Sequence, residues 1–159
     1  MKHKLSPEYM RLAIEEARKN FQTMDGGPFG ACIVKSGKVL AVARNTVLKK
    51  DATCHAEVNA IRRASKKLKT YDLSGCIIYS TTEPCPMCFS AIHWAKIDSV
   101  IFGTHIIDAK KIGFNELSIP AKKMKSQGKS SVKIFPKFLI KECQNLFKAW
   151  NALEDKKLY

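Results

Sequence analysis

The sequence predicts an α/β fold, a three-layer sandwich in which a five-stranded mixed sheet carries helices on both faces. Short apolar runs alternate with segments of helical periodicity along most of the chain. The first two runs are joined by a tight turn, which predicts a hairpin, whereas helix-length segments separate the later ones. With 159 residues, of which 45% are hydrophobic, we expect one domain over residues 1–159.

The N-terminal part predicts a helix followed by a hairpin. Ser6 can cap the helix, and Pro7 suits its first position because proline lacks the N–H that would stay unpaired there. Apolar residues then recur on one helical face up to Phe21. Two strands are expected at residues 29–34 and 38–43, joined by a Ser-Gly turn.

The rest of the chain alternates between helix and strand signals. The expected elements are a helix from about residue 53 to 68, a strand at 76–81, a helix at 86–95, strands at 99–103 and 131–135, and a final helix from residue 136. Residues 104–128 give no clear prediction. Strands that alternate with helices in this way are typical of a three-layer α/β sandwich.

Two short motifs, His-Ala-Glu and Pro-Cys-Pro-Met-Cys, predict a catalytic metal site. The histidine nitrogen of His55 and the sulfurs of Cys85 and Cys88 make three protein ligands, and three ligands leave a fourth tetrahedral position for water, as in catalytic zinc sites. Both cysteines are expected near the start of a helix, whose positive end favours thiolate over thiol. We therefore predict that His55, Cys85 and Cys88 bind Zn²⁺.

Glu57, two residues after the histidine, is the predicted catalytic residue. A carboxylate this close to a zinc-bound water can take its proton and later give protons to a leaving group. Together the two motifs form the established His-x-Glu and Pro-Cys-x-x-Cys signature of zinc deaminases of bases. The predicted reaction is hydrolytic deamination, in which hydroxide attacks a ring carbon that bears an amine and ammonia leaves.

A non-catalytic zinc module is the alternative at these motifs. Structural zinc sites usually have four protein ligands. His3, His93 or His105 could supply the fourth, although His93 would point to another face of the helix that carries Cys88. The remaining cysteines are expected to be reduced, buried and without chemistry: Cys32, Cys54, Cys76 and Cys143.

The formal net charge of +14 raises the possibility of a nucleic-acid partner. Lysine supplies nearly all of this charge, however, and Lys-Lys pairs recur along the whole chain, which favours a solvated surface over a nucleic-acid track. No apolar run approaches the ~20 residues of a membrane-spanning helix, and the chain starts with polar residues. We expect a cytoplasmic protein without a membrane partner.

Segments outside the zinc motifs indicate more closely which family the chain resembles. Beside the zinc motifs, they are Gly-Gly-Pro-Phe-Gly-Ala at 26–31, Asn45, Trp-Ala at 94–95, Gly-Phe at 113–114, Phe-Lys-Ala-Trp at 147–150 and Lys-Lys-Leu-Tyr at 156–159. With these segments, nearly the whole chain resembles the cytidine-deaminase-like superfamily, and within it the bacterial guanine deaminases. The zinc motifs alone indicate only the superfamily.

This resemblance implies that guanine is converted to xanthine and ammonia in purine catabolism or salvage. It also implies a homodimer in which the C-terminal segment, about residues 137–159, swaps onto the partner subunit. Tyr159 would then complete the active site of the partner. A deaminase of another base, such as adenosine in tRNA, cytosine or a related heterocycle, is the alternative.

The resemblance also implies which residues contact the base. Carried over by position, they are Phe29, Asn45, Ala56, Trp94 and Tyr159. Phe29 would stack on the purine, Asn45 would hydrogen-bond it and Trp94 would line the pocket. The family usually reads Gly-Phe-Asp-Asp where this chain reads Gly-Phe-Asn-Glu, so Glu116 is the candidate for binding the ring N–H edge, with a side chain longer by one methylene.

Overall fold

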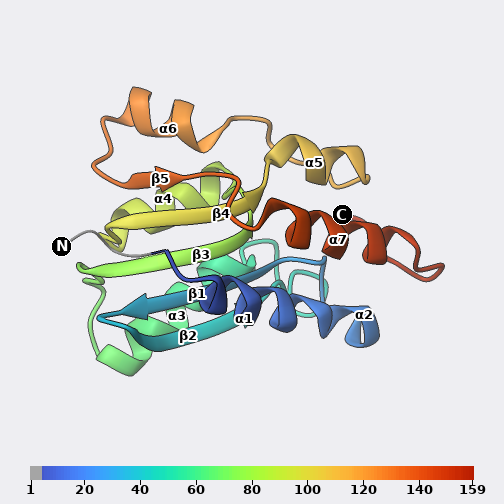
Figure 1. Cartoon of the computed structure of the whole chain (residues 1–159), viewed down its shortest axis with the longest axis horizontal. Coiled ribbons are helices and arrows are strands. Elements are labelled where there is room, and N and C mark those ends of the chain that lie inside the picture. The colour runs from blue at the N-terminus through green and yellow to red at the C-terminus, as the bar shows by residue number, and fades with distance from the viewer. Residues whose placement is uncertain (1–4) are drawn as a thin grey trace.

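The computed structural model describes residues 5–159, and Figure 1 shows the path of the chain. Its elements are, in chain order, α1 (Pro7–Arg18), α2 (Asn20–Thr23), β1 (Gly30–Lys35), β2 (Lys38–Arg44), α3 (Ala56–Leu68), β3 (Cys76–Thr82), α4 (Pro86–Trp94), β4 (Ser99–Thr104), α5 (Ile106–Lys111), α6 (Ala121–Gly128), β5 (Lys133–Phe135) and α7 (Ile140–Asn151).

The sheet has five strands in the order β2-β1-β3-β4-β5. β1 pairs with both β2 and β3 in antiparallel fashion, whereas β3 pairs with β4 and β4 with β5 in parallel. The predicted mixed sheet is therefore confirmed. Because β3 and β4 are parallel, the loops that follow them emerge at the same edge of the sheet.

Side chains of the central strands alternate between two hydrophobic clusters, one on each face of the sheet. In β3, Ile78 belongs to the cluster covered by α3, α4 and the start of α6, whereas Ile77 and Tyr79 belong to the cluster covered by α1 and α7. This period of two is the signature of a strand buried on both faces. Figure 1 shows α1 and α7 on one side of the sheet and α3 and α4 on the other, as the sandwich predicts.

Two helices begin later in the chain than predicted, and the structure shows helices in the region 104–128, for which no clear prediction was possible from the sequence. α3 begins at Ala56, not near residue 53, because the preceding loop bonds to itself through the side chain of Asp51. α7 begins at Ile140, since Lys137 and Leu139 both have positive φ angles that break the helix. The unassigned region contains α5 and α6, which are too short and too lysine-rich to give a clear apolar pattern.

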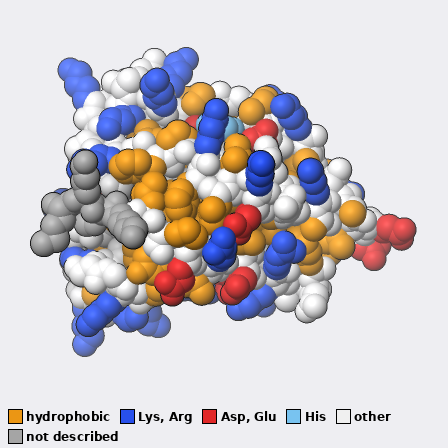
Figure 2. Space-filling model, in the orientation of Figure 1, with side chains coloured by type: hydrophobic (Ala, Val, Ile, Leu, Met, Phe, Trp, Pro, Cys, Tyr) orange, Lys and Arg blue, Asp and Glu red, His pale blue; other side chains and the backbone are white. Residues whose placement is uncertain are grey.

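Lys and Arg side chains are spread around the face drawn in Figure 2, with Asp and Glu among them, and do not form a single track. On this face the charge therefore resembles the solvated surface that the lysine pattern predicts. Across residues 5–159, each helix falls short of the length and hydrophobicity needed to span a bilayer.

Candidate active site

Two helix N-termini bring the predicted zinc ligands together. His55 is the N-cap residue of α3, Cys85 is the N-cap residue of α4, and Cys88 follows in the first turn of α4. One donor atom from each residue lies within 4.8 Å of the others, and Cys85 Sγ is 3.6 Å from His55 Nδ1. Within residues 5–159, no other group of histidine, cysteine and carboxylate side chains has this geometry.

The donor set fits zinc by its chemistry. One imidazole nitrogen and two sulfurs are common ligands of Zn²⁺. The hydrogen bond from Cys88, together with His55, lowers the pKa of Cys85 to about 4, despite burial. Burial opposes the protonation of His55, but its hydrogen bond to Cys85 and the nearby charge of Glu57 outweigh burial and raise its pKa. A thiolate therefore exists at neutral pH.

The prediction that both cysteines are thiolates before metal binds is wrong for Cys88. The neighbouring Cys85 thiolate and complete burial raise the pKa of Cys88 well above its usual value. Two sulfurs this close, in a low-dielectric interior, share one proton, because a second negative charge would be costly. The positive end of α4 does not overcome this repulsion.

Glu57 lies beside the ligands in the first turn of α3, only 6% exposed. Burial and the Cys85 thiolate raise its pKa. The hydroxyl of Ser80, on β3, is 3.0 Å from Glu57 Oε1 and 2.7 Å from the carbonyl oxygen of Thr82. One hydroxyl has one proton, so Ser80 can donate to an ionised Glu57 or accept from a protonated Glu57 while it donates to Thr82. Either protonation state of Glu57 thus has a partner.

The metal ligands His55 and Cys85, together with Glu57, line a cavity at the edge of the sheet. Its lining residues are Phe29, Asn45, His55, Glu57, Thr82, Glu83, Cys85, Glu116 and Tyr159. The free volume of about 20 Å³ is enough for one water. A second cavity of about 230 Å³ lies further out and shares His55, Cys85, Glu116 and Tyr159 with the first. Glu116 and Tyr159 therefore contribute to the walls of both cavities.

Tyr159, the last residue of the chain, is held by hydrogen bonds at both its side chain and its backbone. The backbone N–H of Gly27 donates to its hydroxyl at 3.3 Å, and the N–H of Asn115 donates to its backbone oxygen at 3.0 Å. Its ring packs edge-on against Phe114, with centroids 5.2 Å apart. In the structure the tail thus closes the site of its own chain.

Phe29 and Asn45 lie in the cavity wall as predicted. The Phe29 ring is held edge-on by Phe114 and Phe147, with centroid distances of 4.9 and 5.9 Å, so it is a rigid apolar surface. Asn45 Oδ1 accepts a hydrogen bond from the N–H of Val47, and the Asn45 side chain also contacts the hydroxyl of Tyr159.

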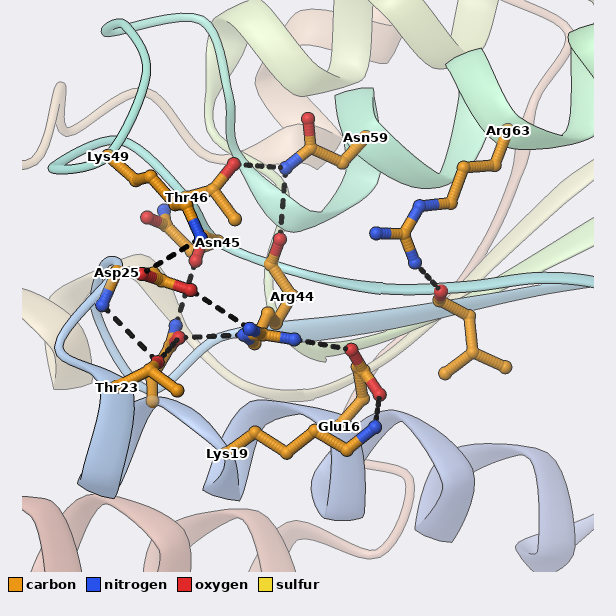
Figure 3. A network of polar contacts seen from close by, with 12 residues as sticks. Glu16, Lys19, Thr23, Asp25, Arg44, Asn45, Thr46, Lys49, Asn59 and Arg63 are labelled. Carbon is orange, nitrogen blue, oxygen red and sulfur yellow. Dashed lines mark hydrogen bonds and ion pairs between the residues drawn. The ribbon is translucent and has the colours of Figure 1, made fainter.

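Behind this wall, Arg44 is the centre of a polar network (Figure 3). Its guanidinium donates to Glu16 at 3.0 Å and to Asp25 at 2.9 Å. Burial opposes ionisation of Asp25, but the hydrogen bonds and charges of Arg44 and Lys49 outweigh it and lower its pKa. These opposite charges hold α1 against the loop that leads to β1.

Asn20, fully buried, connects the same network to the cavity. Its amide nitrogen donates to the carbonyl oxygens of Gly27 and Asn45, both at 2.8 Å, and its oxygen accepts from Arg44. Glycine is needed at Gly26 because a Cβ there would collide with Asn45 Oδ1. The backbone on both sides of Asn45 is therefore held in place.

Glu116 lies between the two cavities, in the segment between α5 and α6. Burial, and to a smaller extent the Cys85 thiolate, raise its pKa to about 7. At neutral pH the Glu116 carboxyl group that would bind a ring N–H edge is therefore present in both its ionised and its protonated form.

Ala56 and Trp94 are the two predicted contacts that the structure places differently. The methyl group of Ala56, at the start of α3, packs in the hydrophobic core, and Ala56 lines neither the inner nor the outer cavity. For a single chain, the prediction that Trp94 lines the pocket is wrong. Trp94 is 78% exposed at the far end of α4, about 14 Å along the helix from Cys85. It lines a separate cavity with Lys96 and Lys133.

The histidines that might have completed a structural zinc site have other partners. His93 Nδ1 is 2.9 Å from Ser130 Oγ, and His105 Nδ1 is 3.2 Å from a carboxylate oxygen of Glu83. His3 lies outside the described residues. Neither of the two described histidines belongs to the metal group.

Three residues near the site were not predicted. Ser80 had little signal, because two threonines follow it in the same strand and only the structure shows that its hydroxyl meets Glu57. Glu83 precedes the second zinc motif directly and could have been suspected for that reason. Asn20 had no signal, since its partners Gly27 and Asn45 are distant in sequence.

Cysteine reactivity tests the electrostatics of the site. After zinc is removed by chelation, we expect iodoacetamide at pH 6 to modify Cys85 first, because its pKa of about 4 makes it a thiolate. Cys32 and Cys143, whose pKa values burial raises to about 12, should react only after unfolding. Peptide mass spectrometry over time would measure the order. Modification of Cys88 before Cys85, or equal rates with zinc bound, would contradict this assignment.

Comparisons with known proteins agree with this geometry. Residues 4–104 match the family model described as cytidine and deoxycytidylate deaminase zinc-binding region. A guanine deaminase of Bacillus subtilis (strain 168) is 38% identical over 152 residues, or 95% of this chain and 97% of that protein. A tRNA-specific adenosine deaminase of Aquifex aeolicus (strain VF5) is 40% identical over 70% of this chain and 76% of that protein. A solved guanine deaminase from Nitrosomonas europaea has a TM-score of 0.84 at 30% identity, covering 94% of this chain and 87% of that one.

Proposed function

The chain belongs to the family defined by the cytidine and deoxycytidylate deaminase zinc-binding region, and we propose that it hydrolytically deaminates guanine to xanthine and ammonia. One observation carries the proposal: a buried glutamate lies beside a His-Cys-Cys donor set in a cavity that also presents an aromatic ring, an amide and a carboxyl group. A base needs all of these, since the ring stacks on its face and the polar groups bind its edge.

The chain's own residues supply the proton transfers. His55, Cys85 and Cys88 would hold the zinc ion, which would supply a water acidic enough to act as the nucleophile near neutral pH. Glu57 takes a proton from this water and gives it to the ring nitrogen next to the carbon that bears the amine. After the water oxygen has bonded to the ring carbon, Glu57 takes the remaining hydroxyl proton and gives it to the amine, so that the C–N bond breaks, ammonia leaves and a carbonyl group forms. Ser80 supports Glu57 before and after each transfer, because its hydroxyl can donate or accept.

The cavity wall would orient the purine after Tyr159 and Glu116 have moved outward, because the free volume of about 20 Å³ holds one water and not a base. Phe29 presents a ring face whose position is held by two other aromatic rings. Asn45 offers its amino group, and Glu116 offers a carboxylate to the ring N–H edge. Tyr159 covers the base from the outer side and excludes water, which strengthens each polar contact.

Glu116→Gln tests the recognition of the N–H edge. We expect kcat/KM for guanine to fall about 10- to 100-fold, because a charge-assisted hydrogen bond is replaced by a neutral one. In the parent protein, kcat/KM should also fall as the pH drops through the pKa of Glu116, about 7, since the protonated form has lost the charge that strengthens the hydrogen bond. The variant should lack this acid limb. Steady-state kinetics between pH 5 and 9 measure both effects.

Glu116→Asp is the matched control, because it keeps the carboxylate and shortens the reach to that of the usual family residue. Its acid limb should remain. Unchanged guanine kinetics in Glu116→Gln would contradict the role of this side chain, whatever the aspartate variant does.

The deciding experiment is turnover of guanine by the zinc-loaded protein, followed as xanthine formation. Adenine, cytosine, cytidine, guanosine and an adenosine-bearing tRNA stem-loop would be assayed in parallel. Selective guanine turnover supports the proposal. Turnover of another substrate would keep the zinc deaminase chemistry and reject guanine.

A deaminase of adenosine in RNA is the second candidate. The net charge of +14 favours it, as does the stretch 117–141, which contains many lysines and no acidic residue. The position of Tyr159 disfavours it, because a polynucleotide must insert a flipped base from solvent and the tail occupies that path. Activity on the stem-loop would decide for this candidate.

We also propose that the chain forms a homodimer with exchanged C-terminal segments, residues 137–159. In the structure this segment packs on its own chain, so exchange would replace those contacts with identical ones between chains. Lys137 and Leu139, both with positive φ, form the turn at which the chain would cross over. The exposed Trp94 ring is available to such a dimer, since large aromatic side chains are often buried at interfaces.

A further inference from the structure

We propose that Glu83 is a positioning residue that holds the Glu116-bearing segment, residues 112–120, in register with the zinc ligands. The inference rests on the proposed function, because it assigns Glu83 a part in substrate recognition. Glu83 lies at the end of β3, two residues before the ligand Cys85, and is 7% exposed. Its backbone N–H donates to the carbonyl oxygen of Thr104 at 2.7 Å, so its own position is set by β4.

The Glu83 carboxylate binds the starts of two helices. Oε1 accepts from the N–H of Ala121, the first residue of α6, at 2.9 Å. Oε2 accepts from the N–H of Ile106, the first residue of α5, at 3.1 Å, and lies 3.2 Å from His105 Nδ1. Helix N-termini carry partial positive charge and unpaired N–H groups, so a buried carboxylate between two of them is well satisfied.

The segment 112–120 joins α5 to α6. The Glu83 side chain therefore binds the chain both before and after this segment. Hydrophobic burial does little to hold it, because Phe114 is its only buried residue. The hydrogen bonds of Glu83 are consequently the main link between this segment and the loop that carries Cys85. A shift of either helix start would move the segment against the zinc ligands.

Three parts of the substrate cavity depend on this segment. Glu116 lines both the inner and the outer cavity. The N–H of Asn115 holds the backbone of Tyr159, and the Phe114 ring supports both Phe29 and Tyr159. The zinc ligands, by contrast, come from the starts of α3 and α4, which Glu83 does not hydrogen-bond. Loosening the segment should therefore weaken guanine binding and leave the metal in place.

Glu83→Gln is the test, because the two side chains have nearly the same shape. Glutamine has one acceptor oxygen, so its amino group must face either the Ala121 or the Ile106 N–H, and one of these donors loses its partner. We expect KM for guanine to rise about 10- to 30-fold with a smaller change in kcat and unchanged zinc content. Hydrogen exchange followed by mass spectrometry should become faster in residues 112–120.

Two control variants separate positioning from general stability. Glu142→Gln removes an exposed carboxylate that pairs with Arg11 on the opposite side of the sheet, and should leave KM and hydrogen exchange of the segment unchanged. Ile97→Ala creates a core cavity away from the site, and should lower Tm without raising KM. If Ile97→Ala raised KM as much as Glu83→Gln, the effect would be one of stability and the inference would be overturned.

The inference is also overturned if Glu83→Gln keeps the parent's KM and exchange rates, or if it loses zinc, which would make Glu83 a support of the ligands. Failure of the proposed function looks different. A parent protein that does not turn over guanine rejects that function, whereas faster exchange in residues 112–120 of Glu83→Gln still supports the positioning role.

Discussion

Glu57→Gln is expected to lower kcat for guanine about 100- to 10,000-fold, the usual contribution of a general acid/base, while zinc content stays the same. The glutamine side chain has nearly the same shape but cannot take or give the proton. Glu57 is buried and is not a member of the donor set, so the metal site should survive its replacement. Stopped assays for xanthine and metal analysis of the purified variant measure the two quantities.

Ser80→Ala is the matched control for this variant. It removes the hydroxyl that supports Glu57 and leaves the carboxylate, so its loss of kcat should be much smaller. Full activity in Glu57→Gln would reject the catalytic role. Loss of zinc in the same variant would show that Glu57 supports the metal ligands and that the activity loss cannot be assigned to proton transfer.

Deletion of residues 157–159 should lower kcat/KM for guanine about 100-fold, the scale expected when reacting groups lose their alignment. The deletion removes the Tyr159 side chain that lines both the inner and the outer cavity, as well as the hydrogen bond from Asn115. Water then reaches the base, and its polar contacts weaken. Tyr159→Phe, which loses only the hydroxyl contact with Gly27, should cost about 10-fold. Unchanged kinetics in the truncated protein would contradict the closing role of the tail.

The truncated chain also decides whether the tails exchange. Mixed dimers would be made by co-expressing it with Glu57→Gln. If tails are exchanged, one of the two sites combines an intact Glu57 with an intact tail, and about half of the parent activity per mixed dimer returns. If each tail closes its own site, as in the structure, both sites stay damaged and no activity returns. Light scattering of the same samples would show whether a dimer forms at all.

Much of the fold could be predicted because its signals are local. The short apolar run of β3, the hairpin turn between β1 and β2, and the proline that opens α4 each depend on neighbouring residues. The zinc ligands were predictable for the same reason, since His55 and the two cysteines belong to short motifs at helix starts. α5 and α6 were not predicted, because their positions depend on hydrogen bonds to Glu83, a residue far away in sequence.

The sequence by itself predicted the zinc donor set, the carboxyl group that the structure places beside it, and the α/β sheet that carries both. Only the tertiary structure decided how those groups meet a substrate. It placed Trp94 outside the cavity, put Tyr159 in the cavity wall and raised the pKa of Cys88 through burial next to Cys85. Burial and the charges of neighbours distant in sequence decide such properties, and both depend on packing that no local motif contains.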